Sequence, residues 1–350
     1  VDFGVGLRHK TSWHMTWQWL NGDSSPDYGV SMIQIGGIYR PITEYGLPRD
    51  TSYTRSFDRD QSNIHMLTSG LKSEVNRWLT ITNDTRLSLY ERDYAATTPS
   101  ACSGACATSF LNGGNPTLPY GAGGGVAYRQ SGWGVQNVLM GRARFKTWFI
   151  KHDLKAGVDI NYASDSRWPG VYANRSNNQT IRTPYYSAPG TSLSFPSSGY
   201  GNANARDVGL FFADKFQLTK QLSLFGTARW DSFSSTYYAR SNQSAGRAEQ
   251  KSDRWSPSAS IVYAPFDNAS FYFTFARSYK PVGTDVSSLV TIRPTAGDVA
   301  QKGVNLSPQR SDLFEFGSKA DFLHKRLGTT ISFFQISETN SRYYDVNGDM

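Results

Sequence analysis

The stretch from Thr147 to Tyr162 alternates between apolar and polar residues. Its even-numbered set is Trp148, Ile150, His152, Leu154, Ala156, Val158, Ile160 and Tyr162. The odd-numbered positions include Lys151, Asp153, Lys155, Asp159 and Asn161. This period of two predicts a β-strand with one apolar and one polar face. At roughly 3.3 Å per residue the strand would be about 50 Å long, well beyond the usual length of about five or six residues.

Two settings produce such a strand. A soluble sandwich accounts for the alternation, but a strand tilted by about 45° across a bilayer also explains the length and the aromatic residue at each end of the apolar stripe. His152 is the exception on the apolar face, and we expect it to lie near a membrane interface.

Composition limits how this chain could cross a membrane. Only 38% of its residues are hydrophobic, its mean hydropathy is −0.49, and no run approaches the roughly 20 apolar residues of a membrane helix. Any span must therefore be a closed β-barrel, the other structure that satisfies its own backbone hydrogen bonds in lipid.

Apolar and alternating stretches come in six pairs joined by very short connections. The pairs are 1–10 with 12–20, 61–74 with 78–92, 135–146 with 148–162, 207–218 with 222–231, 255–264 with 270–280, and 311–322 with 327–340. Their turns are rich in Asn, Asp and Lys, which is typical of tight β-hairpins. The pattern predicts about 12 antiparallel strands.

Long connections separate these pairs. They run over 21–60, 93–134, 164–206, 238–253 and 281–310. Loops of this length are rare in compact soluble domains, whereas outer-membrane barrels combine short periplasmic turns with long extracellular loops. We therefore predict an all-β protein, a transmembrane antiparallel β-barrel in the bacterial cell outer membrane.

The two faces of the strands can be assigned from the alternation. Val208, Leu210 and Phe212 share an apolar face, while Asp207 and Lys215 fall on the opposite face and are expected to line a polar lumen. The adjacent pair at 333–334, Phe-Phe, breaks the alternation and leaves the facing of that strand open.

The segment from Trp255 to Pro281 resembles the barrel of TonB-dependent siderophore receptors. It contains a strand that begins with Ser-Pro, a Pro-x-Asp-Asn turn, and an aromatic strand that ends in Ser-aromatic-x-Pro. Residues 26–29, 306–319 and 331–340 are similar to the same family, in the same order. The resemblance implies a barrel of about 22 strands. We therefore expect residues 1–350 to be part of one barrel domain, without the amino-terminal plug domain or the last strands.

The resemblance also implies a function. Receptors of this family take up ferric siderophores across the outer membrane and are driven by the TonB energy-coupling complex, which acts through the plug. Iron would be carried as the ferric siderophore, without a covalently bound cofactor or an enzymatic reaction. The expected partners are the siderophore, the TonB complex, and outer-membrane lipid and lipopolysaccharide, with the receptor as a monomer.

Two alternatives come from other classes, a passive porin and an outer-membrane hydrolase. The five histidines form no HExxH motif and no Gly-x-Ser-x-Gly elbow is present, which disfavours the hydrolase. The net charge is +8, but the basic residues are dispersed and form no tail or helix, so we expect no nucleic-acid partner.

Cys102 and Cys106 lie four positions apart in the second long connection. They could be half of a metal site, but no His or further Cys lies nearby to complete four ligands. A disulfide that pins an extracellular loop in an oxidising compartment is the interpretation we favour.

Aromatic and basic residues gather in the long connections and at the adjoining strand ends. The candidate ligand-binding residues are Tyr90, Arg92, Tyr94, Tyr120, Arg129, Trp133, Trp168, Tyr172, Tyr237 and Lys280. Some could instead form an interfacial aromatic girdle. Tyr90 and Arg92 are the best candidates because they share the predicted lumen face. Rings together with cations favour an anionic, ring-bearing ligand, so we predict a ferric catecholate rather than a neutral hydroxamate.

Overall fold

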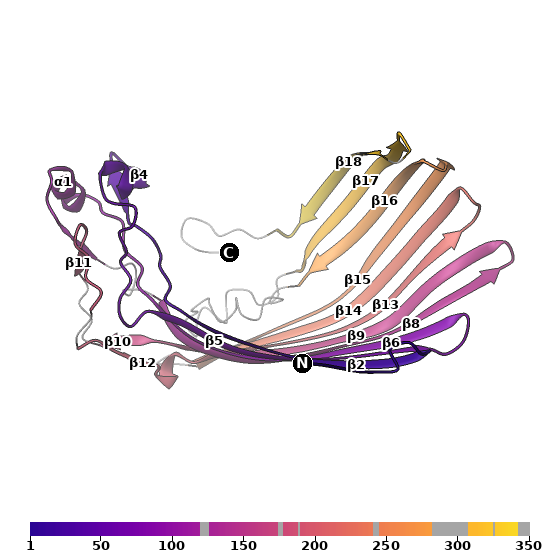
Figure 1. The fold of residues 1–350 in the computed structure, drawn as a ribbon, viewed down its shortest axis with the longest axis horizontal. Helices are drawn as coiled ribbons and strands as arrows, with labels where there is room; N and C mark the ends of the chain where they lie inside the picture. Colours follow the sequence, from indigo (N-terminus) through magenta and orange to yellow (C-terminus); the bar gives the residue numbers. More distant parts are fainter. Residues whose placement is uncertain are drawn as a thin grey trace.

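The computed structural model describes residues 1–119, 126–173, 178–187, 190–240, 245–281, 307–324 and 326–341. Its main feature is one antiparallel sheet of 12 strands in chain order (Figure 1). The strands are β1 (Asp2–Val5), β2 (Thr11–Ser24), β5 (Arg59–Glu74), β6 (Leu79–Ala96), β8 (Val126–Thr147), β9 (Ile150–Pro169), β13 (Gly201–Gln217), β14 (Leu222–Arg240), β15 (Ala245–Phe266), β16 (Ala269–Lys280), β17 (Gln309–Phe322) and β18 (Leu327–Thr339). This confirms the predicted all-β antiparallel architecture. Among the described helices, none is both long and apolar enough to cross a membrane.

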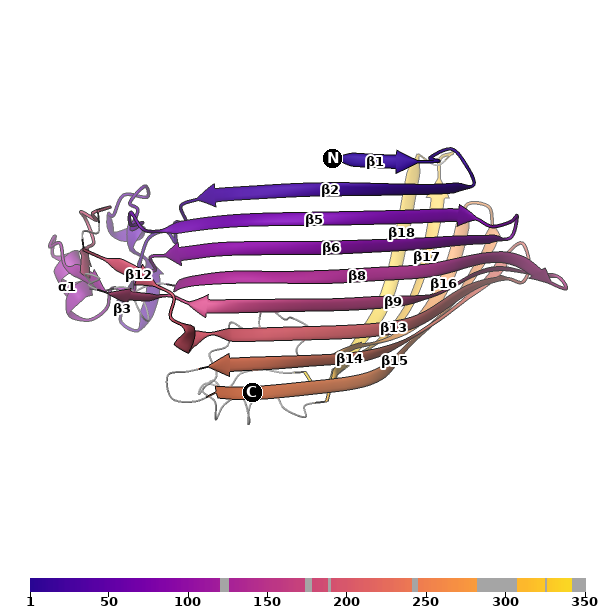
Figure 2. The same ribbon diagram turned by 90° about the horizontal axis from the view of Figure 1, so that it is seen from below.

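The sheet has two unlike ends, as Figure 2 shows along the strands. At the turn end, short turns join each hairpin, and polar side chains hold them. Asn76 accepts hydrogen bonds from the backbone N–H groups of Trp78 and Leu79, both at 2.9 Å. The Thr219 hydroxyl does the same for Gln221 at 3.1 Å, as expected for turn residues of these types. At the other end, here called the loop end, the long connections emerge.

The long strand predicted from Thr147 begins later than expected. β8 ends at Thr147 and β9 begins at Ile150, while Trp148 lies in the turn with φ of 55° and is 92% exposed. Its placement on the strand was wrong, because a short hairpin turn needs a residue in the left-handed region. At the loop end the strands run further than predicted. β8, for example, starts at Val126.

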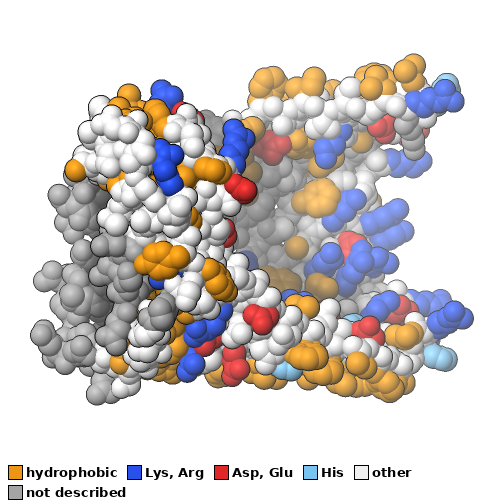
Figure 3. Space-filling view, turned by 60° about the vertical axis from the view of Figure 1, so that its left-hand side comes forward, with side chains coloured by type: hydrophobic (Ala, Val, Ile, Leu, Met, Phe, Trp, Pro, Cys, Tyr) orange, Lys and Arg blue, Asp and Glu red, His pale blue; other side chains and the backbone are white. Residues whose placement is uncertain are grey.

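The sheet is curved, and its concave side, here called the inner face, points upward in Figure 1. The convex side, the outer face, carries most of the exposed large apolar side chains, including Leu139, Ile160, Leu210, Phe212, Phe273 and Phe316. Figure 3 shows apolar side chains along the outer rim and charged ones within the curve. This distribution suits a sheet with lipid on one side and water on the other.

Polar residues also occur on the outer face. Asn83 and Asn137 exchange amide hydrogen bonds at 3.2 Å, and Asn137 also donates to the Thr85 hydroxyl at 2.7 Å. Because each polar group has a partner within the sheet, the cost of placing it against lipid is lowered.

His152 and Asp214 form an ionisable pair on the same face. His152 Nδ1 lies 2.7 Å from Asp214 Oδ2, and the side chains are only 11% and 9% exposed. The Phe145 ring stacks on the imidazole at a centroid distance of 4.7 Å, and Phe216 meets it edge-on at 5.2 Å. The pair lies near the turn end, since His152 is the third residue of β9.

The inner face is polar. Arg229 lies 3.3 Å from Asp159, 3.4 Å from Asp207 and 2.6 Å from Asp231, each distance measured between side-chain N and O atoms. A Cβ at Gly209 would lie 2.2 Å from the Arg229 guanidinium, so a larger residue there would force the guanidinium to shift. The predicted inner position of Asp207 is confirmed by its register.

The open question about residues 333–334 is answered by strand pairing. Phe333 pairs with Phe316 and Phe334 with Glu315. Phe333 therefore lies on the outer face and Phe334 on the inner face.

The long connections contain small elements of their own at the loop end. These are β3 (Met32–Ile35), β4 (Ile38–Pro41), η1 (Ile42–Tyr45), α1 (Ala105–Leu111), β7 (Thr117–Pro119), β10 (Val171–Ala173), β11 (Asn178–Thr180), β12 (Ser192–Ser194) and η3 (Ser197–Gly199). Three of the connections share a buried cluster of Ile33, Ile42, Leu47, Tyr53, Cys102, Ala107, Phe110, Leu118 and Ile181. We call this cluster and its surrounding segments the cap.

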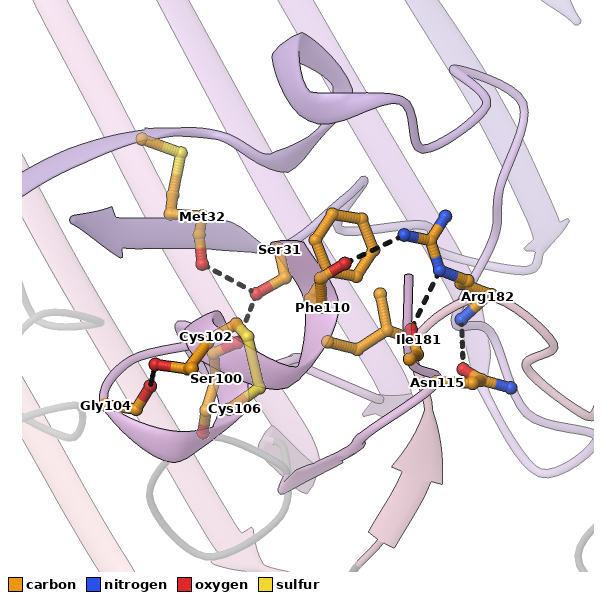
Figure 4. Close-up of a disulfide and its surroundings, with 12 residues drawn as sticks. Ser31, Met32, Ser100, Cys102, Gly104, Cys106, Phe110, Asn115, Ile181 and Arg182 are labelled. Atoms are coloured by element: carbon orange, nitrogen blue, oxygen red, sulfur yellow. Dashed lines mark hydrogen bonds between the residues drawn. A yellow bond between two sulfur atoms is a disulfide. The ribbon is translucent and has the colours of Figure 1, made fainter. Parts of the chain in front are cut away.

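Polar contacts tie the cap together, as Figure 4 shows around the disulfide between Cys102 and Cys106. The Cys102 N–H donates to the carbonyl of Met32 at 2.8 Å. The Arg182 guanidinium donates to the Phe110 carbonyl at 3.0 Å. The Tyr53 hydroxyl donates to the Ile181 carbonyl at 3.0 Å, and burial raises the pKa of Tyr53 to about 12.

Candidate functional site

Arg92 is the centre of a polar and aromatic cluster on the inner face at the loop end. Its guanidinium makes a bidentate contact with Asp60, with both N–O distances at 2.7 Å. It also donates to the Tyr128 hydroxyl at 2.9 Å. Its Cζ lies 4.7 Å from the centre of the Tyr94 ring. Because β5, β6 and β8 are neighbours in the sheet, strand pairing alone brings these groups together.

A second arginine, Arg167 of β9, extends the cluster. Its Cζ lies 3.6 Å from the centre of the Tyr128 ring, which is close enough for a strong cation–π contact. Tyr128 stacks on Tyr94 with ring centroids 5.1 Å apart, and the Tyr94 hydroxyl is hydrogen-bonded to that of Tyr28 from the cap side of the sheet. The Arg92 guanidinium therefore contacts both rings, and the Arg167 guanidinium contacts the Tyr128 ring.

Asp165 anchors the neighbouring part of the cluster. It is 3% exposed and accepts hydrogen bonds from the Tyr90 hydroxyl and, at 2.7 Å, from Gln130. A Cβ at Gly132 would lie 2.5 Å from the Tyr90 ring. Glycine at that position lets the ring lie flat against the next strand.

The charged side chains of this cluster differ in how far they are exposed. The Arg92 side chain is 37% exposed, whereas its partner Asp60 is 28% exposed and Asp165 is almost fully buried. The Tyr94 and Tyr128 rings are only 6% and 8% exposed, so the cluster presents mainly its guanidinium groups to an incoming anion, and the buried rings support them.

Eight of the ten sequence-predicted residues fall into three groups. Tyr90, Arg92, Tyr94 and Tyr237 lie on the inner face near this cluster, and Tyr237 is 8% exposed. Lys280 shares the inner face but belongs to β16, several strands away. Arg129, Trp133 and Trp168 lie on the outer face, as their register shows.

The remaining two predicted residues differ in position. Tyr172 lies in β10, with its ring centroid 5.2 Å from that of Phe57, and is not part of the inner cluster. Tyr120 lies outside the described residues. Trp133 packs on Tyr162 at 4.9 Å on the outer face, which fits the aromatic-girdle interpretation.

The cluster members that were not predicted from the sequence include Asp60, Tyr128, Gln130, Asp165 and Arg167. Each lies outside the strand boundaries expected from hydrophobicity. Continuing the alternation of the predicted strand at 135–146 back to residue 128 would have placed Tyr128 on the inner face. Strand pairing puts it there, directly opposite Tyr94.

No group of three His, Cys, Asp or Glu side chains that could hold a metal ion occurs in the part of the chain that the structure describes. The cluster consists of guanidinium, phenol, amide and carboxylate groups. These can bind a ligand by charge, hydrogen bonds and stacking.

Comparison with known proteins matches this architecture. The family model described as TonB dependent receptor-like, beta-barrel matches residues 2–350. The chain is 23% identical over 360 residues to PiuA of Acinetobacter baumannii, named a probable TonB-dependent siderophore receptor, covering 96% of this chain and 46% of PiuA. It is 24% identical over 379 residues to Fiu of Escherichia coli, named a catecholate siderophore receptor, covering 97% of this chain and 47% of Fiu.

Solved structures have the same fold. The crystal structure of PiuA gives a TM-score of 0.76 at 19% identity and covers 95% of this chain and 48% of PiuA. The closed form of Fiu gives a TM-score of 0.77 at 18% identity and covers 99% of this chain and 52% of Fiu. The chain spans about half the length of the curated relatives that it matches. The match over residues 2–350 means that this chain belongs to the TonB-dependent receptors, an outer-membrane family of transporters rather than enzymes.

Proposed function

We propose that the receptor containing this chain takes up a ferric siderophore of the catecholate type and that TonB drives the uptake. The observation that carries this proposal is the pair of guanidinium groups around the Tyr94 and Tyr128 rings at the loop end of the inner face. Family membership supports the transport class, and the similarity to Fiu, a catecholate siderophore receptor, supports the ligand class.

The proposed contacts follow from the chemistry of the ligand. A ferric catecholate is an anion that displays flat aromatic rings. Arg92 and Arg167 would attract its charge, and Tyr90 would offer stacking surface at low entropic cost. A neutral hydroxamate lacks both features. The loop end would then be extracellular and the turn end periplasmic.

Of the sequence-predicted residues, we propose Tyr90 and Arg92 as ligand contacts, with Arg167 added to them. Tyr94, Tyr128 and Tyr237 are buried rings, and we propose that they support these contacts. Arg129, Trp133 and Trp168 are left out because their side chains belong to the opposite face of the sheet.

The test is a binding titration of the full-length receptor with an iron-loaded catecholate and an iron-loaded hydroxamate. Arg92→Ala removes the exposed cation, and we expect it to weaken catecholate binding by about tenfold or more, since charge-assisted hydrogen bonds contribute roughly 1.5–3 kcal/mol. Arg142→Ala is the matched control. Arg142 is also an inner-face arginine paired with an aspartate, Asp153, but it lies at the turn end.

Equal affinity for both chelators, or loss of binding in the control alone, would overturn the ligand assignment. Coupling is tested separately by measuring uptake of the bound iron complex in cells with and without TonB. Uptake that persists without TonB would contradict the transport proposal and favour passive passage.

A further inference from the structure

The inner face carries a second group of basic side chains, at its turn end. Three neighbouring strands, β8, β9 and β13, contribute its members, which are Arg142, Arg144, Lys146, Lys151, Lys155 and Lys215. Figure 3 shows Lys and Arg side chains gathered on the side of the curve away from the cap. Asp153 is the only carboxylate that these described strands place among them. This end of the face therefore has a strong excess of positive charge.

The two arginines and the four lysines of the group differ in their partners. Arg142 Nε lies 2.7 Å from one oxygen of Asp153, and Arg144 Nε lies 3.6 Å from the other. The four lysines form no ion pair with any residue that the structure describes, and all four are exposed. The lysines are therefore the cations that an incoming anion could use.

The strand register sets like charges against each other in this group. Lys146 lies directly opposite Lys151, and Arg142 lies directly opposite Lys155, across the pairing of β8 with β9. Like charges in opposite positions destabilise a sheet. A bound anion would remove that repulsion, so the arrangement favours an anionic ligand.

A hollow lies beside these lysines at the turn end. It has a volume of about 630 Å³, and its lining includes Lys151, Lys215, Lys220 and Phe149. Phe149 is 70% exposed. The hollow thus combines cations with an aromatic residue, which is the combination found around Arg92 at the loop end.

The charge of the inner face changes from the loop end to the turn end. At the loop end Arg92 is paired with Asp60. In the middle of the sheet, Arg229 lies within 3.4 Å of three aspartates, so carboxylates outnumber the guanidinium. An anion is disfavoured there and is attracted again by the unpaired lysines at the turn end. The face therefore offers an anion two separate positions.

Lysine suits a position that an anion must leave again. Its ammonium group is a strongly hydrated point charge on a flexible stem, whereas the arginine fork fixes an anion by paired hydrogen bonds. From Lys151 to Lys155 the lysines cover about 13 Å along the strand. They can therefore offer several charges to one multiply charged ligand without fixing its orientation.

We propose that Lys146, Lys151, Lys155 and Lys215 form an exit site that receives the anionic ferric complex after it has crossed the middle of the inner face. This inference rests on the proposed function, from which it takes the ligand class and the periplasmic position of the turn end. The loop-end cluster would then determine the affinity for the ligand. The exit site would determine how fast the complex passes to the periplasm.

The test measures initial uptake of a radioactive, iron-loaded catecholate by cells that carry the full-length receptor. For Lys151→Gln with Lys215→Gln, we expect the maximal uptake rate to fall by about tenfold, since a charged surface raises capture rates by roughly 10–10³. Binding of the same chelate to cells without an energy source should stay unchanged, because the loop-end cluster is intact. Lys151→Arg with Lys215→Arg keeps both charges and should retain the wild-type rate.

Lys72→Gln with Lys319→Gln is the matched control. Both are exposed lysines at the turn end of the inner face, but they belong to β5 and β17 and lie outside the group. This pair loses the same charge, and its uptake should stay at the wild-type rate. Urea unfolding in lipid vesicles checks the fold of the test variant. It should unfold at the same or a higher urea concentration, because Lys146 no longer faces a like charge.

Three outcomes would contradict the exit site. Unchanged uptake in the glutamine pair of Lys151 and Lys215, with normal binding, would overturn the exit site and leave the proposed function standing. A wild-type receptor that binds no catecholate would overturn the proposed function, and the exit site with it. If the glutamine pair admits a bulky antibiotic that the outer membrane excludes, the lysines hold a segment that closes the barrel, and the exit site is wrong.

Discussion

The sheet and the cap bury their apolar residues in different ways. In the sheet, large apolar side chains such as Phe212 and Leu210 remain 47% exposed, because the backbone ladder leaves them pointing outward. In the cap, Phe110 and Ile181 are at most 1% exposed and pack on residues from three separate connections. The sheet therefore needs lipid to complete its burial, whereas the cap has a core of its own in water. We expect the two regions to respond differently to the same kind of substitution.

The largest effect is expected in the cap. Phe110→Ala removes a buried ring that also packs against the Arg182 guanidinium at 4.1 Å, and such truncations cost about 3–5 kcal/mol. We expect rapid protease cleavage within the cap while the sheet keeps its heat-resistant form. Leu111→Ala is the control, because the neighbouring Leu111 is 46% exposed. If the sheet melts at a lower temperature in the Phe110 variant, the two regions unfold as one unit.

A smaller effect is expected at the ionisable pair on the outer face. Asp214→Ala leaves the His152 ring without its acceptor among Phe145 and Phe216, which should cost about 1–3 kcal/mol of unfolding free energy. Replacing both members with leucine should restore most of that stability, as with other buried pairs. Urea unfolding in lipid vesicles measures both. Asp84→Ala, an exposed carboxylate on the inner face, is the control. If the double leucine variant is as unstable as Asp214→Ala, the His152 and Asp214 pair stabilises the sheet by more than its mutual hydrogen bond.

The smallest effect concerns the Asn83 and Asn137 pair. Leucine at both positions removes two amides from the apolar band, and we expect the sheet to become more stable by about 0.5–1 kcal/mol. Asn137→Leu alone should not increase the stability of the sheet, because it leaves the Asn83 amide without its partner. Unfolding midpoints in vesicles provide the measurement. A loss of stability in the double variant would mean that this part of the outer face is covered by something other than lipid.

The hairpins of the sheet could be predicted from the sequence because their information is local. A period of two and a turn with Asn76 or Thr219 specify both strands of a pair within about thirty residues. The same parity correctly placed Tyr90 and Arg92 on one face. Trp148 was misplaced because the turn conformation overrides the alternation at the ends of a strand.

The cap and half of the candidate site could not be predicted in this way. Ile33, Phe110 and Ile181 come together from three connections. None of these segments has a hydrophobic periodicity that predicts which of its residues are buried. Asp165 and Arg167 lie where the strands leave the apolar band, so hydrophobicity no longer marks the strand although pairing continues. Arg129 and Trp168 were grouped with Tyr90 from composition alone, without parity, and the register places them on the opposite face of the sheet.

Tyr128 and Arg129 are adjacent in β8, yet Tyr128 lies on the inner face opposite Tyr94 and Arg129 lies on the outer face opposite Asp93. Because side chains alternate between the two faces of a strand, the facing of every residue depends on its position in a period of two. Inserting or deleting one residue on the loop side of Gly132 would move each of these side chains to the opposite face of the sheet, whereas a change of two residues would keep the facing. Length variation among descendants of this sequence should therefore occur in even steps here, and a single-residue shift should damage both surfaces at once.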